Sequence, residues 1–379
     1  MSNTNKGLEG VVIGQTTISQ VAGEAGQLIY GGYRIEDLAG NTSFEEVCHL
    51  LWYGELPSGT QLTALRRRFA SSMAVDERVL DVVRKVAADG HPMATLRTAV
   101  SALSAADPDA EDMSPEAADR KAVRLTAQTI TLTAAIERIR RGSDPIAPRE
   151  DLSLAANLLY MMHGAVPDDL AERIIDASLI LHAEHGMNAS TFSARVTAST
   201  LADMHSAVTA AIGTLKGPLH GGANERVMQM LLAIDQPGNA AQWVRDALGR
   251  GEKIMGFGHR VYRTLDPRAP ILKKLAEQLL ERGGDTRWLQ ISENIQATMH
   301  EEMQRKGKKI YPNVDFFSAS VYYTLGIPMD LFTNLFACAR MAGWTAHVKE
   351  QLNDNRLIRP KAEYVGPQGR TTAPIAQRA

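Results

Sequence analysis

The chain has 379 residues, of which 44% are hydrophobic and 22% charged, and its formal net charge is -2. These values are ordinary for a globular enzyme and argue against a nucleic-acid partner, which would require a basic surface. The longest apolar runs are shorter than a membrane span, and the first ten residues lack the apolar stretch of a signal peptide. Two cysteines, Cys48 and Cys338, form no C-x-x-C pair. We therefore expect a cytoplasmic protein without membrane contact or a thiolate metal site.

Strand signals are confined to the start of the chain. Short β-branched runs broken by glycine predict strands near residues 11–21 and 27–30. Helical signals follow, beginning with Ser43 and Glu46, which have the spacing of a capping box. The overall pattern predicts a mainly α fold with a few short N-terminal strands.

Further helix starts are marked by proline. Proline follows His91 and Ser114 at a plausible first helical position. Pro167 precedes a helix that we expect to run to about residue 184, with apolar side chains at helical spacing. Alanine-rich stretches near 123–136 and 206–215 predict buried helices.

A composition shift indicates a domain boundary. Gly217 and Pro218 end one helix, and Gly221 and Gly222 precede the next. The segment that follows, to about Thr324, is more charged than the alanine- and leucine-rich blocks on either side. We expect a small mobile domain over 222–324 that closes on a large domain formed by 1–221 and 325–379.

Three short islands each place one ionisable side chain in a turn, beside glycine, proline or asparagine. The islands are 217-GPLHGGANE-225, 255-MGFGHRVYRTLDPRA-269 and 311-YPNVDFFSAS-320. The side chains are His220, His259 and Asp315. Two imidazoles and a carboxylate can transfer protons near neutral pH without a metal or organic cofactor.

His220 and Asp315 each allow two interpretations. At a helix N-terminus His220 stays neutral and can donate one N–H bond to a developing oxyanion, or it simply caps the helix. Asp315 lies between Val314 and Phe316, and partial desolvation would raise its pKa and make it a better general base. The alternative is an ordinary aspartate at a helix start.

The glycine-rich stretch before His259 resembles a truncated G-x-G-x-x-G. Val261 stands where the third glycine belongs, and no βαβ unit surrounds it, so a dinucleotide fold is rejected. A loop of this kind, with Arg260 and Arg263 nearby, could still bind phosphates. A lysine run at 306–309 is interpreted chiefly as a solvated face, with a phosphate contact as the lesser alternative.

Two other groups are candidates for ligand contact. His182 and His185 have the spacing of a metal half-site, but no third ligand has an obvious place, and a polar ligand contact suits His185 better. Arg340 lies in an apolar stretch and needs a partner, which is either an internal carboxylate or a carboxylate of the substrate.

The three islands, with FACAR and a following IRP, closely resemble the citrate synthase family in the same order, from GLEGV near residue 7 to about residue 366. The resemblance implies a mainly helical two-domain homodimer that condenses acetyl-CoA with oxaloacetate and hydrolyses citryl-CoA. CoA is then part of a substrate, and no cofactor is implied. FFSAS replaces the family's usual FYSG, which leaves the shape of the acyl pocket open.

The resemblance also implies roles for individual residues. Asp315 would remove the methyl proton, His220 would stabilise the enol or enolate, and His259 would protonate the ketone. The residues implied to hold oxaloacetate are His185, Arg268, Arg340 and, from the other subunit, Arg359. Those implied to contact CoA are Arg263, Ile254, Met255, Gly256, Phe257 and Gly258.

Alternatives to this activity remain open. 2-Methylcitrate synthase has the same fold and residues but uses propionyl-CoA, and one methylene is worth only about 1–3 kcal/mol in a pocket. A non-catalytic acyl-CoA-binding protein of the same fold would be favoured by loss of His220, His259 or Asp315, and all three are present. The chain begins almost at the shared core, so we expect the dimeric type and not the longer hexameric, NADH-inhibited type.

Overall fold

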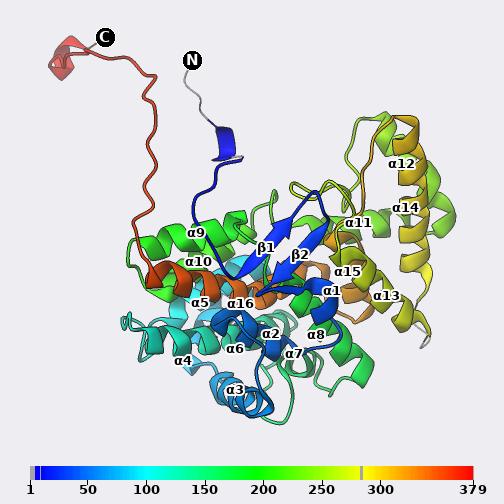
Figure 1. Cartoon of the computed structure of the whole chain (residues 1–379), viewed down its shortest axis with the longest axis horizontal. Coiled ribbons are helices and arrows are strands. Elements are labelled where there is room, and N and C mark those ends of the chain that lie inside the picture. Colours follow the sequence, from blue (N-terminus) through cyan, green and yellow to red (C-terminus); the bar gives the residue numbers. More distant parts are fainter. Residues whose placement is uncertain (1–4, 9, 282–284, 379) are drawn as a thin grey trace.

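The computed structural model describes residues 5–8, 10–281 and 285–378, and sixteen α-helices lie in this part of the chain (Figure 1). The expected mainly α fold is therefore confirmed. A large body contains α1 (Ile35–Leu38), α2 (Phe44–Tyr53), α3 (Gly59–Ser72), α4 (Glu77–Ala87), α5 (Pro92–Leu103), α6 (Pro115–Arg140), α7 (Leu154–His163), α8 (Asp169–Ala183), α9 (Ala189–Ser199), α10 (Met204–Leu215) and α16 (Phe332–Asn353). A second group, toward the right of Figure 1, contains α11 (Ala223–Ile234), α12 (Ala240–Gly249), α13 (Arg268–Glu281), α14 (Arg287–Arg305) and α15 (Val314–Thr324). Short 3₁₀ helices span Lys6–Leu8, Pro237–Asn239, Met329–Leu331 and Ile375–Gln377.

A small antiparallel sheet precedes the helices. β1 (Ser19–Ala22) pairs with β2 (Gln27–Tyr30), which pairs in turn with β3 (Tyr33–Arg34). The strand expected at 27–30 is confirmed, but the strand expected over 11–21 forms only from Ser19 onward. Residues 11–18 are β-branched in part but pair with no strand in the described chain. Without a partner strand, β propensity alone does not produce sheet structure.

The turn of this hairpin lies directly against the loop that carries His259. The backbone N–H of Arg263 donates to the carbonyl oxygen of Gly23 at 3.1 Å. A Cβ atom at Gly23 would lie 2.3 Å from the carbonyl oxygen of Val261, so only glycine permits this approach. The hairpin therefore fixes the loop through backbone contacts.

The helix starts predicted from capping residues are confirmed. Ser43 and Glu46 form a complete capping box at α2, and His91 and Ser114 cap α5 and α6, each followed by proline. Asp168 accepts two backbone N–H bonds at the start of α8. These helix starts are set by residues close in the sequence, because each capping side chain accepts hydrogen bonds from N–H groups that the helix itself leaves unpaired.

Helix α16 forms the centre of the large body. It packs against α6, α8 and α9, and it is buried without interruption from Phe332 to Val348. Polar side chains on a helix buried all round must find partners inside the protein, and Arg340 and His347 are two of them. Despite such buried helices, none of those described here has the length and apolar character needed to cross a membrane.

The second group of helices packs largely on itself. α11 and α13 both contact α15, and α12 contacts α14. These helices lie within 222–324, the segment for which we predict a small mobile domain. The division into two domains and the mobility of this segment remain predictions.

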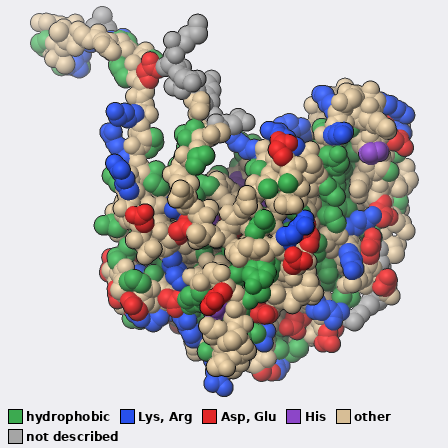
Figure 2. All heavy atoms as spheres, viewed as in Figure 1, with side chains coloured by type: hydrophobic (Ala, Val, Ile, Leu, Met, Phe, Trp, Pro, Cys, Tyr) green, Lys and Arg blue, Asp and Glu red, His purple; other side chains and the backbone are tan. Residues whose placement is uncertain are grey.

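Both terminal segments stand clear of the large body on the same side of the molecule (Figures 1 and 2). Tyr364 and Val365, in the extended segment after α16, are 66% and 90% exposed. Val12, in the N-terminal segment, is 87% exposed.

Candidate active site

His220 lies in the turn between α10 and α11, but Gly222 and not His220 is the N-cap of α11. Its Nε2 atom lies 2.8 Å from the Ser190 hydroxyl, which also accepts the indole N–H of Trp344 at 3.1 Å. Burial, reinforced by the charge of Arg340, lowers the pKa of His220 to about 4. The ring is therefore neutral near pH 7 and is positioned by Ser190.

His259 lies in the loop between α12 and α13 and is held by its own backbone. Its Nδ1 atom accepts the N–H groups of Val261 at 3.0 Å and Tyr262 at 3.1 Å. Burial, followed by the charge of Arg268, lowers its pKa to about 4. Because Nδ1 accepts, the hydrogen-bond network assigns the proton of this neutral ring to Nε2, which makes Nε2 a donor.

Asp315 is the second residue of α15, and the Asn313 side chain caps that helix by accepting the Asp315 N–H at 3.0 Å. Burial raises the pKa of Asp315 to about 6, and the nearby charges of Arg268 and Arg340 limit the rise. The carboxylate is thus ionised at neutral pH yet more basic than an ordinary aspartate. The predicted desolvation is confirmed, and it suits a general base.

Gly256 brings the His259 loop next to the start of α15. Its φ angle is +77°, and a Cβ atom there would lie 2.8 Å from the Phe316 ring. Its carbonyl oxygen accepts the Asn313 N–H at 2.9 Å. Glycine meets both requirements, the backbone conformation and the close approach, so His259 and Asp315 come to lie on adjoining segments.

Arg268 begins α13 and is almost completely buried with Asp266. The guanidinium donates to both carboxylate oxygens of Asp266, at 2.9 and 2.8 Å, and the Val314 N–H donates to the same carboxylate at 3.1 Å. Burial opposes the ionisation of both groups, but their pairing lowers the pKa of Asp266 and raises that of Arg268. The pair joins the starts of α13 and α15 and so positions Arg268 relative to Asp315.

His185 follows α8 and is also buried. Its Nε2 atom lies 3.2 Å from the Tyr262 hydroxyl, and its ring centre lies 5.2 Å from that of His259. Burial, followed by the charge of Arg268, lowers its pKa well below the usual value. The site therefore contains a third neutral imidazole.

Arg340 is 1% exposed, on α16. Its Nε donates to the His182 carbonyl oxygen at 2.7 Å, and its guanidinium carbon lies 4.7 Å from the centre of the Phe336 ring. Burial lowers its pKa to about 10, although the charge of Glu184 partly offsets this effect. No carboxylate in the described part of the chain forms an ion pair with Arg340, so its charge remains available to a ligand.

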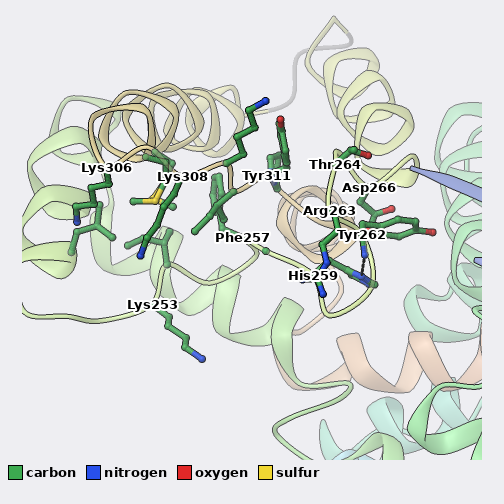
Figure 3. A pocket seen from close by; sticks show the side chains of 18 of the residues that line it. Lys253, Phe257, His259, Tyr262, Arg263, Thr264, Asp266, Lys306, Lys308 and Tyr311 are labelled. Carbon is green, nitrogen blue, oxygen red and sulfur yellow. Dashed lines mark hydrogen bonds between the residues drawn. The ribbon is translucent and has the colours of Figure 1, made fainter. Parts of the chain in front are cut away.

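A cavity of about 560 Å³ extends from His259 (Figure 3). Figure 3 shows His259 and Tyr262 toward one end, lysines toward the other and the Phe257 ring between them. The lysines that line the cavity are Lys253, Lys306, Lys308 and Lys309. The run at 306–309, interpreted from the sequence chiefly as a solvated face, therefore borders a cavity whose cationic end suits phosphate groups.

The fold brings most of the predicted site residues together. The residues in this cluster, which we call the catalytic cluster, are His185, His220, His259, Arg268, Asp315 and Arg340. The histidines and Asp315 each lie close enough to a cluster arginine for its charge to shift their pKa. Of the residues predicted to contact CoA, those that line the cavity are Ile254, Phe257, Gly258 and Arg263. Met255 and Gly256 lie outside its lining.

Arg359 lies apart from the catalytic cluster of its own chain. It is exposed, on the segment that leaves the body after α16. That segment begins with bonds from Asn355 and Ile358 to Ser199, both at 3.1 Å. No contact in the described residues joins Arg359 to the cluster, and its predicted action in a partner's site remains a prediction.

Within the described residues, no group of three or more His, Cys, Asp or Glu side chains is arranged to hold a metal ion. The two histidines with half-site spacing have other partners. His182 Nδ1 lies 2.8 Å from the Ser178 carbonyl oxygen, and His185 contacts Tyr262. His185 therefore has a polar contact within the protein, and its contact with a ligand remains a prediction.

Three residues of the site, Asp266, Ser190 and Tyr262, were not predicted from the sequence. Asp266 left a signal, because an Asp two residues before an Arg can reach its guanidinium. Ser190 and Tyr262 left none, since they contact His220 and His185 across 30 and 77 residues of chain.

The chain is similar in sequence to citrate synthases over nearly its whole length. The sequence model of the family described as citrate synthase, C-terminal domain, matches residues 7–361. A citrate synthase of Haloferax volcanii is 50% identical over 98% of each chain, and citrate synthase 2 of Bacillus subtilis is 48% identical over 99% of each. A 2-methylcitrate synthase of Mycobacterium tuberculosis is 46% identical over 96% of this chain and 91% of its own.

Solved structures show the same likeness. A citrate synthase from Pyrobaculum aerophilum has a TM-score of 0.93 and 42% identity, covering 98% of this chain and 95% of its own. A citrate synthase from Thermoplasma acidophilum, solved as a ternary complex with carboxymethyl coenzyme A and oxaloacetate, has a TM-score of 0.93 and 34% identity over all of both chains.

Proposed function

Because the chain belongs to the citrate synthase family, and is an acyltransferase of the citrate (Si)-synthase type, we propose that the catalytic cluster condenses acetyl-CoA with oxaloacetate and hydrolyses citryl-CoA to citrate and CoA. One observation carries the assignment of the site. A carboxylate with a raised pKa and three neutral imidazoles stand beside two buried arginines. This arrangement suits proton abstraction next to a thioester and the binding of a dicarboxylate.

Asp315 and His220 act together on the acetyl group. The Asp315 carboxylate takes a methyl proton, and the electron pair of the C–H bond moves toward the thioester oxygen. In the tautomer that we propose, His220 Nε2 accepts the Ser190 N–H at 3.3 Å and the proton of the neutral ring lies on Nδ1. Nδ1–H then donates to the thioester oxygen and stabilises the enol or enolate.

His259 and the two arginines act on oxaloacetate. The Nε2–H of His259 polarises the ketone oxygen and supplies its proton as the new carbon–carbon bond forms. Arg268 and Arg340 neutralise the carboxylates, and His185 donates to one of them. Water then attacks the thioester carbonyl and returns a proton to His259. The C–S bond breaks, and the departing thiolate takes the proton that Asp315 removed from the methyl group, which releases CoA and citrate.

The lysine-bordered end of the cavity accommodates CoA. Lys253, Lys306 and Lys308 lie at the end far from His259, which suits the phosphates of CoA while the thioester reaches the catalytic cluster (Figure 3).

The residues 222–324 close over the substrates and exclude water from the enolate. We expect oxaloacetate to bind first, and equal acetyl-CoA affinity with and without an oxaloacetate analogue would contradict that order.

The proposed assembly is a homodimer in which Arg359 serves the partner's site. Its exposure, on a segment that stands clear of its own body, supports this assignment. Mixed dimers of Arg359→Ala with Asp315→Ala should recover activity, because one of the two sites then contains both groups. No recovery on mixing would mean that Arg359 acts within its own subunit.

The measurement that tests the function is the initial rate of thiol release from acetyl-CoA and from propionyl-CoA, each with oxaloacetate. We expect a higher kcat/KM for acetyl-CoA. A preference for propionyl-CoA would assign the second candidate, 2-methylcitrate synthase, which is the name of several relatives at 44–46% identity. No oxaloacetate-dependent release from either ester would refute both.

A further inference from the structure

We propose that Tyr262 is a further substrate-binding residue, whose hydroxyl binds the same oxaloacetate carboxylate as His185. The proposal rests on the proposed function and deepens it, because it assigns a neutral hydrogen-bond donor to a carboxylate otherwise left to His185 and the arginines.

Tyr262 touches two of the three imidazoles of the catalytic cluster. Its backbone N–H donates to His259 Nδ1 at 3.1 Å, and its hydroxyl lies 3.2 Å from His185 Nε2. Its ring centre lies 4.6 Å from that of His259 and 5.5 Å from that of His185. The side chain is 4% exposed, so its hydroxyl lies inside the cluster and not on the surface.

The 3.2 Å contact between His185 and Tyr262 allows either atom to be the donor. We take the tautomer in which the single proton of the neutral His185 ring lies on Nε2. In that form the Tyr262 oxygen faces Nε2–H, and the O–H of the tyrosine is free to donate to a ligand. Two donors 3.2 Å apart can bind the two oxygens of one carboxylate.

The surroundings of the hydroxyl keep it protonated. Burial raises the pKa of Tyr262 far above its usual value, and the charges of Asp266 and Glu36 add to the rise while Arg268 opposes it, so the group keeps its proton at any working pH. Arg268 acts electrostatically on both Tyr262 and His185. A carboxylate placed between these donors would therefore meet a protonated hydroxyl, an imidazole N–H and a nearby cation.

The ring is held before any ligand binds. The next residue, Arg263, donates its N–H to Gly23, and the close approach of Gly23 to Val261 fixes the loop on the other side. A donor held in advance loses little entropy when the ligand arrives. The loop also carries His259, so one backbone segment positions the group that polarises the ketone and a group that binds a carboxylate.

The test is Tyr262→Phe, which keeps the ring and removes only the hydroxyl. We expect the KM for oxaloacetate to rise about tenfold, equivalent to about 1.4 kcal/mol, as for a hydrogen bond to a charged group. The KM for acetyl-CoA at saturating oxaloacetate should stay within about twofold, because the loss concerns ground-state binding of the other substrate. Tyr323→Phe, which removes a hydroxyl from a partly exposed ring on α15, is the matched control and should leave both values unchanged.

Two readouts separate substrate binding from a structural role. Calorimetric titration of oxaloacetate into the folded variant should show the same tenfold loss, and it tests Tyr262 even if the wild-type protein fails to turn over acetyl-CoA. A hydroxyl that only supports the loop would lower the unfolding temperature and kcat while oxaloacetate affinity stayed at the wild-type value. That result, or an unchanged oxaloacetate KM in a stable variant, overturns the proposal.

Discussion

Helix α16 contributes to two groups of buried ionisable side chains that differ in how their charges are balanced. Arg340 belongs to the catalytic cluster. His347, two turns later, belongs to a second group that we call the ion-pair chain, formed by Glu184, His347, Arg195 and Glu350. Arg195 donates to His347 Nδ1 at 3.1 Å and to Glu350 at 2.5 Å, and His347 Nε2 donates to Glu184 at 3.1 Å.

In the catalytic cluster the balance is incomplete. Arg340 has no ion-pair partner among the described residues, burial raises the pKa of Asp315 to about 6, and the histidines are kept neutral. In the ion-pair chain an opposite charge or a hydrogen-bond acceptor meets each donor. The difference indicates that the ion-pair chain stabilises the fold, whereas the cluster holds oriented groups ready for charge that arrives with substrate.

The largest expected effect of a single change concerns the base. Asp315→Asn should lower kcat by about 10²–10⁴-fold, because the amide cannot accept the methyl proton. Oxaloacetate affinity, measured by calorimetry, should change little. Near-normal turnover in this variant would remove Asp315 from its role and with it the functional contrast between the two groups.

The corresponding change in the ion-pair chain should affect stability instead. Arg195→Met removes the buried member of a pair whose Glu350 side chain is 23% exposed, and it should lower the free energy of unfolding by about 1–3 kcal/mol, because Glu350 and His347 lose their donor. Urea denaturation at matched protein concentration measures the loss. The kcat of the fraction that remains folded should stay within about threefold of wild type. A large fall in kcat without destabilisation would mean that the two groups are functionally one.

The pH dependence of kcat/KM tests whether the catalytic cluster contains a base with a raised pKa. Asp315 must be ionised to act as a base, and its pKa is about 6. We therefore expect kcat/KM for acetyl-CoA to fall about tenfold per pH unit below pH 6. His220 and His259, with pKa values of about 4, remain neutral over this range and do not limit the rate. A profile that stays flat to pH 5 would contradict the raised pKa of Asp315.

The smallest expected effect is on how the free energy of unfolding changes with pH. His220 and His259 have folded-state pKa values of about 4, below their unfolded values near 6.5, so acid protonates them first in the unfolded chain. Their contribution is present above pH 6.5 and is lost as the pH falls, by about 1 kcal/mol each at pH 5.5. Asp315 acts in the opposite direction between its unfolded and folded pKa values. Urea denaturation at pH 7 and 5.5 measures the sum, and His220→Asn should reduce the difference.

Much of the local structure follows from local chemistry. Ser43, His91, Ser114 and Asp168 start helices because each satisfies N–H groups within its own turn. The strand expected from residue 11 begins only at Ser19. A strand needs a partner strand beside it, and residues 11–18 have none in the described chain. Capping therefore depends on neighbours in sequence, and strand formation on neighbours in space.

The sequence by itself determined the helical class, most helix starts and the three turns that contain His220, His259 and Asp315. The tertiary structure alone decided how these turns face one another and which groups hold them. Asp266 reaches the start of α15 across 48 residues, and Tyr262 reaches His185 across 77. Such contacts arise only when helices pack. Packing also removes water from the cluster, and this desolvation sets the pKa values on which the proposed chemistry depends.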